Sequence, residues 1–263
     1  MWTRHWGLSR DPFLDGPSSF VPLGDHREAV DRLLYTIEAG QPLAVLAAGE
    51  GLGKSMVLGR ALAEARRADR RIALSEAAVD SPTLWGDLAD RLGGRASAPM
   101  GDDRAASWRR LERAAKVCAL QGRRIVLAVD GCEGLDASSR RDLDRLARLE
   151  AATVILTWRD GGEGEGGEAE PPPSLWTLAI RLVPLTFSQA QTYLGDKLAS
   201  AGCPDALFTH RAAVRLHAAS RGVPRGLDRL ASLALAAAAS RGMEAVSSEV
   251  VDGVATECRV PPV

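Results

Sequence analysis

The stretch LAVLAAGEGLGKSMVLGRAL, from Leu43 to Leu62, decides the fold of this 263-residue chain. It begins with an apolar run of strand length, passes through a glycine-rich loop and leads into KSMVLGRALAEARRA, whose apolar spacing is helical. A glycine-rich loop between a buried strand and a helix is the context in which phosphate-binding loops occur. The stretch therefore predicts an α/β nucleotide-binding fold.

The composition of this loop matches what phosphate binding requires. Backbone N–H groups must point inward, glycines must leave room for phosphates, and a lysine and a hydroxyl must supply a cation and a magnesium ligand. Lys54 and Ser55 provide these two side chains. The loop residues that we expect to bind nucleotide are Gly49, Glu50, Gly51, Leu52, Gly53, Lys54 and Ser55.

One position departs from the consensus G-x-x-x-x-G-K-[ST], because Ala48 stands where the first glycine belongs. Its methyl group is tolerable where the local φ is negative and costs about 1 kcal/mol where φ is positive. Lysine is scarce in this chain and occurs only at Lys54, Lys116 and Lys197, which argues against an accidental lysine in the loop. The structural alternative is a glycine-rich turn that binds no ligand.

A second chemical feature lies at the end of the segment RIVLAVD, residues 124–130, where five consecutive apolar residues are followed by a carboxylate. Asp130 at the end of a buried strand is expected to hold magnesium together with Ser55. A second carboxylate usually positions the attacking water. Gly131 follows Asp130 directly, so Glu133 is the candidate catalytic base; its structural alternative is a solvated residue at a helix entry.

The remaining pattern predicts an α/β domain followed by a small helical domain. Alternating strands and helices indicate a parallel sheet covered on both faces. Residues 159–173, RDGGEGEGGEAEPPP, cannot bury enough apolar surface and are expected to be a flexible acidic insert. Expected strands are 42–48, 71–76, 124–130, 153–158 and 178–185; expected helices are 25–40, a helix from Ser81, 103–121, 138–149, 187–201, 210–220, 224–241 and 247–257. The expected domains are therefore 1–185, an N-terminal arm plus the α/β core, and 186–263, the helical lid.

Composition limits the classes of function. With 46% hydrophobic residues the chain can form a proper core, and a net charge of −1 gives no global basic field for nucleic acid. Nucleic acid is thus a possible partner that is not favoured. The four cysteines lack the spacing of a zinc site, nothing at the N-terminus resembles a signal peptide, and no apolar run reaches membrane length. We expect a cytoplasmic protein without direct membrane insertion.

Longer motifs carry a resemblance to a known family. The arm HWGLSRDPF, the helix HREAVDRLLYTIEAG, the loop AGEGLGKS and the segment FTHRAAVRLHAASRGVPRGLDRL together resemble the ExeA-type branch of the AAA+ P-loop ATPases, also called general secretion pathway protein A. This resemblance covers nearly the whole chain. It departs at the strand end, where the family has D-E-A-Q/H and this chain has DGCEG.

The resemblance implies roles for residues outside the loop. Arg225 in GVPR corresponds to the lid arginine that contacts the γ-phosphate, and Thr157 to a polar sensor residue between the two main motifs. Arg159 and Arg181 are candidates for arginine fingers donated across subunits of an ATP-dependent homo-oligomer. The implied ligands are ATP or ADP and Mg2+.

Three functions are compatible with this pattern. The leading hypothesis is a nucleotide-dependent switch with slow or conditional ATP hydrolysis, which contacts proteins of a secretion or pilus-type envelope assembly. The second is a DNA-associated regulator resembling the TniB-type transposition ATPases, with Arg66, Arg67, Arg70 and Arg71 as candidate DNA contacts. The third is a scaffold that binds nucleotide without hydrolysing it.

Overall fold

A computed structural model gives the fold of the chain. It describes residues 2–14, 20–21, 23–76, 81–93, 104–132, 135, 137–149, 151–160, 177–203 and 206–258. The chain forms two compact units. One, here called the α/β unit, contains residues 25–50 and 54–182, and the other, the helical unit, contains residues 1–24, 51–53 and 183–263.

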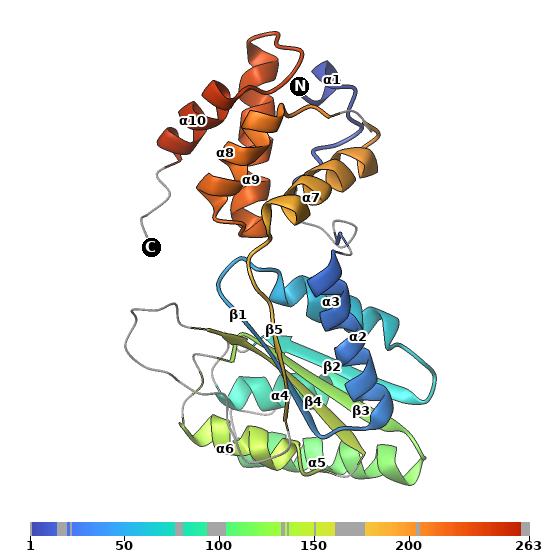
Figure 1. Cartoon of the computed structure of the whole chain (residues 1–263). Helices are drawn as coiled ribbons and strands as arrows, with labels where there is room; N and C mark the ends of the chain where they lie inside the picture. The colour runs from blue at the N-terminus through green and yellow to red at the C-terminus, as the bar shows by residue number, and fades with distance from the viewer. Residues whose placement is uncertain are drawn as a thin grey trace. The chain divides into compact units, whose positions relative to one another are not determined.

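The α/β unit is built on a parallel five-stranded sheet in the order β2-β3-β4-β1-β5 (Figure 1). The strands are β1 (Leu43–Ala48), β2 (Arg70–Glu76), β3 (Arg124–Asp130), β4 (Ala152–Arg159) and β5 (Thr177–Arg181). The central strands β1, β3 and β4 are buried almost throughout, as continuous apolar runs in a parallel sheet should be. All five strands match segments expected from the sequence, and the expected fold class is confirmed.

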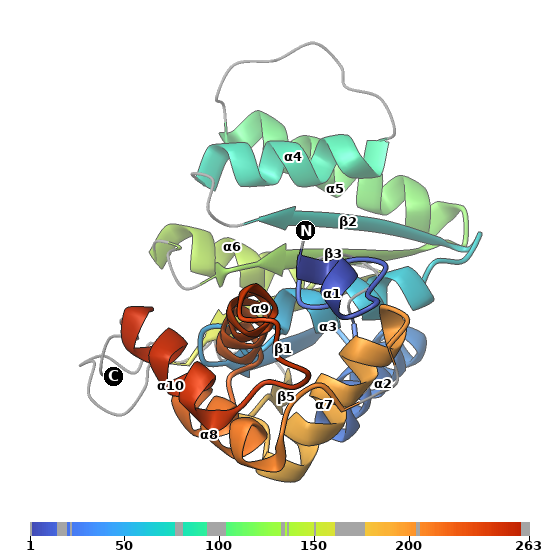
Figure 2. The same cartoon turned by 90° about the horizontal axis from the view of Figure 1, so that it is seen from above.

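Helices cover both faces of this sheet. Figure 1 shows α2 (Gly24–Ala39) and α3 (Lys54–Glu64) on one face and α4 (Ser81–Gly93), α5 (Arg104–Leu120) and α6 (Ala137–Leu146) on the other. Figure 2, turned by 90°, shows α4 and α5 running side by side along the sheet. Trp85 of α4 and Trp108 of α5 are buried in the core beneath them, with their rings edge to face at 5.9 Å. The layers are those of a doubly covered α/β fold.

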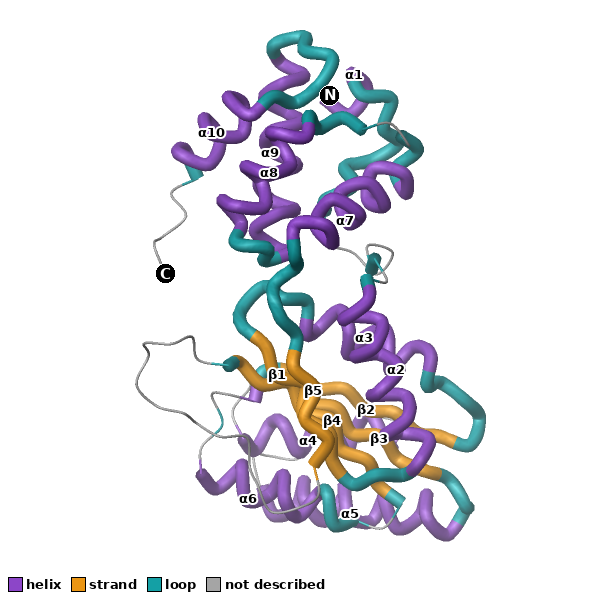
Figure 3. The backbone as a smooth tube through the Cα atoms, viewed as in Figure 1, coloured by secondary structure: helices purple, strands orange, loops and turns teal. Residues whose placement is uncertain are grey.

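The helical unit consists mainly of α7 (Phe187–Ser200), α8 (His210–Ser220), α9 (Pro224–Ser240) and α10 (Ser248–Glu257), which Figure 3 shows in purple. The capping box expected at Thr186 and Gln189 is present, because each residue's side chain accepts a hydrogen bond from the other's backbone N–H. No helix among the described residues combines the length and apolar character that a bilayer crossing requires.

The N-terminal arm belongs to the helical unit, whereas the sequence pattern grouped it with the α/β core in 1–185. Its short helix α1 (Trp2–His5) is followed by Trp6, Leu8 and Phe13, which are buried in the core of the helical unit. Trp6 Nε1 donates to the backbone oxygen of Leu235 at 3.1 Å. This difference arises because the arm precedes α2 in the sequence but buries its aromatic rings against helices near the other end of the chain. Local sequence patterns do not predict contacts between segments so far apart.

A buried ion pair joins two helices of this unit. Lys197 of α7 and Asp228 of α9 are 2% and 8% exposed, and their Nζ and Oδ2 atoms are 3.4 Å apart. Tyr193 also donates from its hydroxyl to the same carboxylate oxygen at 2.8 Å. Removing one partner of such a pair leaves an uncompensated buried charge, so we expect loss of either side chain to destabilise this unit.

The position of the arm generates a first prediction. Trp6→Ala removes a buried indole and its hydrogen bond, so it should lower the free energy of unfolding of the helical unit by about 3–5 kcal/mol. Hydrogen exchange should then accelerate in α9. Leu14→Ala, on the same arm but 68% exposed, is the matched control and should change little. Unchanged protection of α9 in Trp6→Ala would contradict the assigned role of the arm.

Candidate functional site

The glycine-rich loop occupies the position expected for a phosphate-binding loop. Strand β1 ends at Ala48, and helix α3 begins at Lys54. Ala48 is fully buried as the last residue of the strand, and its φ is not positive. Its methyl group therefore carries no backbone strain, and the missing consensus glycine does not distort the loop.

Two glycines of the loop adopt a conformation that other residues rarely take. Gly51 has φ +75° and Gly53 has φ +93°. A Cβ at Gly51 would lie 2.9 Å from Val223 Cγ1 and 3.1 Å from Arg225 Cβ, both in the helical unit to which Gly51 also belongs. Space and backbone conformation both require glycine at 51.

The Lys54 ammonium contacts the start of the loop. Its Nζ donates to the carbonyl oxygens of Ala48 at 2.9 Å and Gly49 at 3.1 Å. The ammonium thus bridges the first turn of the loop from the first residue of α3, near a helix N-terminus that itself favours anions. Ser55 is the second residue of α3 and is exposed, so its hydroxyl is accessible to a metal ion. The donor set fits a magnesium-bound polyphosphate.

The end of β3 carries the second part of the site. Thr157 of β4 is fully buried, and its hydroxyl donates to Oδ1 of Asp130. The same hydroxyl oxygen accepts the backbone N–H of Gly131 at 2.7 Å. The structure therefore brings together the carboxylate expected to hold magnesium and the threonine expected at the sensor position.

The backbone after Asp130 turns in a way that only glycine adopts readily. Gly131 has φ +80°, although a Cβ there would meet no atom within 4 Å. A glutamate at this position would therefore have room but would be strained by its backbone conformation. Glu133, the candidate base, lies outside the residues that the structure describes.

Arg225 lies at the start of α9, in the segment GVPR. Gly222 has φ +72°, and a Cβ there would lie 2.3 Å from the carbonyl oxygen of Leu185, so the motif's glycine is required. Pro224 is the first helical residue, and the N-cap residue Val223 makes no side-chain cap. The N–H of Arg225, one of the N–H groups that a helix start leaves available, donates to the Gly51 carbonyl at 3.2 Å. Arg225 as a whole residue is exposed.

Two ion pairs that the sequence pattern did not predict lie at the carboxyl edge of the sheet. Glu50 Oε2 and Arg159 Nη1 are 3.8 Å apart, and Asp160 Oδ2 and Arg181 Nε are 3.1 Å apart. The sequence singled out Glu50 as a loop residue and both arginines as candidates for contacts across subunits. Their pairing depends on the register of β4 and β5 against β1, which local patterns do not contain.

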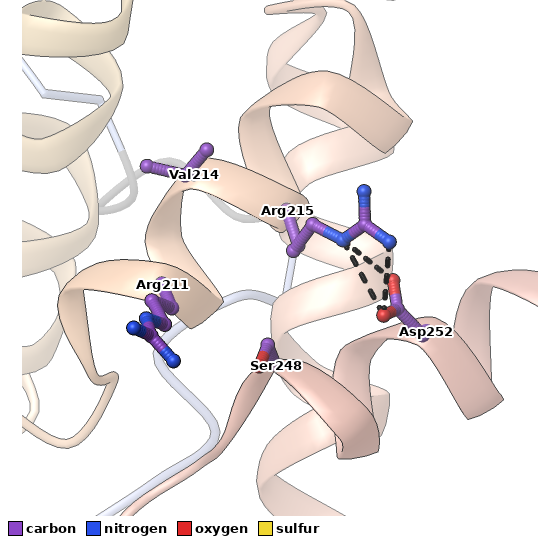
Figure 4. Close-up of a pocket in the computed structure, with 5 residues that line it drawn as sticks. All are labelled: Arg211, Val214, Arg215, Ser248 and Asp252. Atoms are coloured by element: carbon purple, nitrogen blue, oxygen red, sulfur yellow. Dashed lines mark hydrogen bonds and ion pairs between the residues drawn. The ribbon is translucent and has the colours of Figure 1, made fainter.

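A separate hollow of about 280 Å³ lies between α8 and α10 of the helical unit (Figure 4). Arg215 is paired there with Asp252, with Nε and Oδ1 2.9 Å apart. The neighbouring carboxyl of Glu249 has its pKa lowered, mainly by a hydrogen bond from Ser247 and to a smaller extent by Arg211. The two arginines of this hollow thus face carboxylates, so it is a poorer anion site than the loop.

The contacts of Thr157 generate a second prediction. Thr157→Val deprives the Gly131 N–H of its acceptor and should lower the free energy of unfolding by about 1–3 kcal/mol. Exchange of the Gly131 amide hydrogen, followed by NMR, should accelerate in Thr157→Val and stay protected in Thr157→Ser, which keeps the hydroxyl. Equal exchange rates in the two variants would contradict this arrangement.

Comparison with known proteins shows which sequences and folds the chain resembles. No protein-family model matches it. It is 28% identical over 271 residues to general secretion pathway protein A of Aeromonas hydrophila, an alignment that covers 96% of this chain and 47% of that protein. The chain thus spans about half the length of this curated relative.

Solved structures share its fold. Cdc6p from Pyrobaculum aerophilum superposes with a TM-score of 0.76 at 15% identity and covers 97% of this chain and 73% of its own. ORC1 of Aeropyrum pernix, solved in complex with DNA, gives 0.62 at 20% identity, covering 94% and 68%. The RuvB branch migration motor of Thermotoga maritima gives 0.55 at 16% identity, covering 96% and 74%. In sequence the chain is therefore similar to general secretion pathway protein A over nearly its whole length, and in fold it is similar to Cdc6, ORC and RuvB proteins.

Proposed function

We propose that the chain binds MgATP and uses its nucleotide state to switch contacts with other proteins. The observation that carries this proposal is the position of Lys54, whose ammonium lies on the first two carbonyls of an open glycine loop. Asp130, held by Thr157 at the end of β3, supplies a carboxylate at the same edge of the sheet. A cation and a metal-binding carboxylate at the carboxyl edge of one parallel sheet suit a nucleoside triphosphate.

Each proposed contact has a defined chemical task. The amides of Gly49, Glu50, Gly51, Leu52 and Gly53 would bind phosphate oxygens, and Lys54 would neutralise part of their charge. Ser55 and Asp130 would hold Mg2+, which supplies charge neutralisation between the phosphates when bound. Arg225 would contact the terminal phosphate through a guanidinium that stays charged at all physiological pH values.

Hydrolysis is proposed to be slow or conditional. Gly131 replaces the carboxylate that follows Asp130 in the related family, and its positive φ disfavours any side chain there. Glu133 is the proposed base because it is the nearest carboxylate after this turn. Glu133 stands two positions farther along the sequence than the residue directly after Asp130, so we propose that it acts as a base only in some states of the protein. A chain in which it never does so would be a scaffold that binds nucleotide without turnover.

The proposed setting is a secretion or pilus-type envelope assembly. Its support is the similarity, over 96% of this chain, to a protein named for the general secretion pathway. In this proposal the chain acts in the cytoplasm, forms an ATP-dependent homo-oligomer and contacts envelope proteins. ATP and ADP would favour different contacts, so nucleotide exchange or turnover would time the assembly.

The proposed nucleotide site predicts a specific loss of binding. Lys54→Ala should weaken binding of both ATP and ADP roughly 10- to 100-fold, because a charge-assisted hydrogen bond contributes about 1.5–3 kcal/mol. Isothermal titration calorimetry with Mg2+ measures this. Lys116→Ala, an exposed lysine of α5, removes the same charge away from the loop and should bind like wild type. Absence of heat with wild type at millimolar ATP would overturn the proposal. Phosphate release indistinguishable between wild type and Lys54→Ala would leave the non-hydrolysing scaffold.

A DNA-associated role is the alternative, and the arginine cluster after α3 is the observation that favours it. Arg66 and Arg71 are exposed, whereas Arg67 is paired with Glu38 at 2.9 Å and so contributes less free charge. If this role holds, a gel-shift assay at low salt should detect DNA binding that disappears as salt is raised, because phosphate contacts release counterions. Joint substitution of Arg66 and Arg71 by Ala should reduce it. No shift at low salt, with or without ATP, would remove this alternative.

A further inference from the structure

Four charged residues lie at the carboxyl edge of β1, β4 and β5: Glu50, Arg159, Asp160 and Arg181. Arg159 is paired in register with Ala48, and Arg181 with Ala47, so both arginines lie level with the end of β1. Asp160 donates its N–H to the Ala48 carbonyl at 3.1 Å, which fixes the chain after β4 against the start of the loop. This edge therefore holds Arg159 in a definite place next to Glu50.

Arg159 ends a strand that lies between the two parts of the proposed nucleotide site. Strand β4 lies between β3, which ends at Asp130, and β1, which leads into the loop. Thr157 and Arg159 are two residues apart on β4 and so lie on the same face of the sheet. Because the Thr157 hydroxyl contacts Asp130, this face of β4 joins the proposed metal carboxylate on one side to the loop on the other.

The contact between Arg159 and Glu50 is easily exchanged. Their side chains are 52% and 69% exposed, and Arg159 Nη1 lies 3.8 Å from Glu50 Oε2. Exposed ion pairs contribute little, because solvent screens them and ordering two long side chains costs entropy. A guanidinium binds phosphate more strongly, through two parallel charge-assisted hydrogen bonds. A polyphosphate in the loop would also repel the Glu50 carboxylate.

From this geometry we propose that Arg159 is a phosphate-binding residue of its own subunit, which exchanges Glu50 for the terminal phosphate of a nucleoside triphosphate. When no nucleotide is bound, Glu50 would hold the Arg159 guanidinium beside the loop. The inference rests on the proposed nucleotide site and adds to it a residue that distinguishes ATP from ADP. In this proposal Arg159 contacts the nucleotide of its own subunit. Arg181, which is paired with Asp160, makes no contact with the nucleotide.

Calorimetric titration of the full chain with ATP and with ADP, each with Mg2+, tests the exchange. Arg159→Ala should weaken ATP binding about tenfold and ADP binding less than threefold. Arg159→Lys, which keeps the charge but loses the planar fork, should recover part of the ATP affinity. In the Glu50→Gln background, Arg159→Ala should weaken ATP binding more than it does in wild type, because Arg159 no longer gives up its contact with Glu50 when it binds phosphate.

The controls separate this inference from the proposed function. Arg71→Ala removes an exposed arginine at the opposite end of β2 and should bind both nucleotides like wild type. Thermal unfolding of each variant reports whether it remains folded. An unchanged ATP-to-ADP affinity ratio in a folded Arg159→Ala, or a loss of ATP affinity in Arg181→Ala alone, would overturn the inference. Failure of wild type to bind ATP would instead overturn the proposed function.

Discussion

The contact of the Lys54 ammonium with the carbonyls of Ala48 and Gly49 is the interaction on which the candidate site depends. It places a positive charge at the end of β1 and ties the start of α3 to the end of the strand. Gly51 and Gly53 make this closure possible, because positive φ values turn the chain within five residues. A contact that fixes the start of the loop lowers the entropic cost of ordering it, and such preorganisation would favour binding of an anion.

The order of strands determines which residues can act with this loop. Parallel strands end at one edge of the sheet, so the ends of β3, β4 and β1 form a continuous row. Asp130 ends β3 and Arg159 ends the neighbouring strand β4, and the two side chains carry opposite charges. Asp130 contacts Thr157, and Arg159 contacts Glu50. Metal ion and phosphate need opposite charges next to each other, and adjacent parallel strands supply them at a fixed spacing.

Most of the architecture follows from local sequence patterns, and the exceptions share a physical cause. Continuous apolar runs predict β1 and β3, the capping box predicts the start of α7, and the strand end at Asp130 predicts a carboxylate at the sheet edge. The burial of Trp6 among the later helices and the contact of Glu50 with Arg159 could not be predicted, since both join segments more than 100 residues apart. The left-handed turn at Gly131 is a third case, because glycine permits such a turn without requiring it.

That turn bears on the kind of switch that this site can form. The Gly131 N–H is bound by Thr157, and the same hydroxyl donates to Asp130, so the conformation of the turn and the orientation of the metal carboxylate are coupled through one oxygen atom. A shift of Asp130 would act on the same hydroxyl that accepts the Gly131 N–H. The turn leads directly to Glu133, the proposed base. If the proposed nucleotide site and base are right, this shared hydroxyl would link nucleotide binding to the turn that precedes the base.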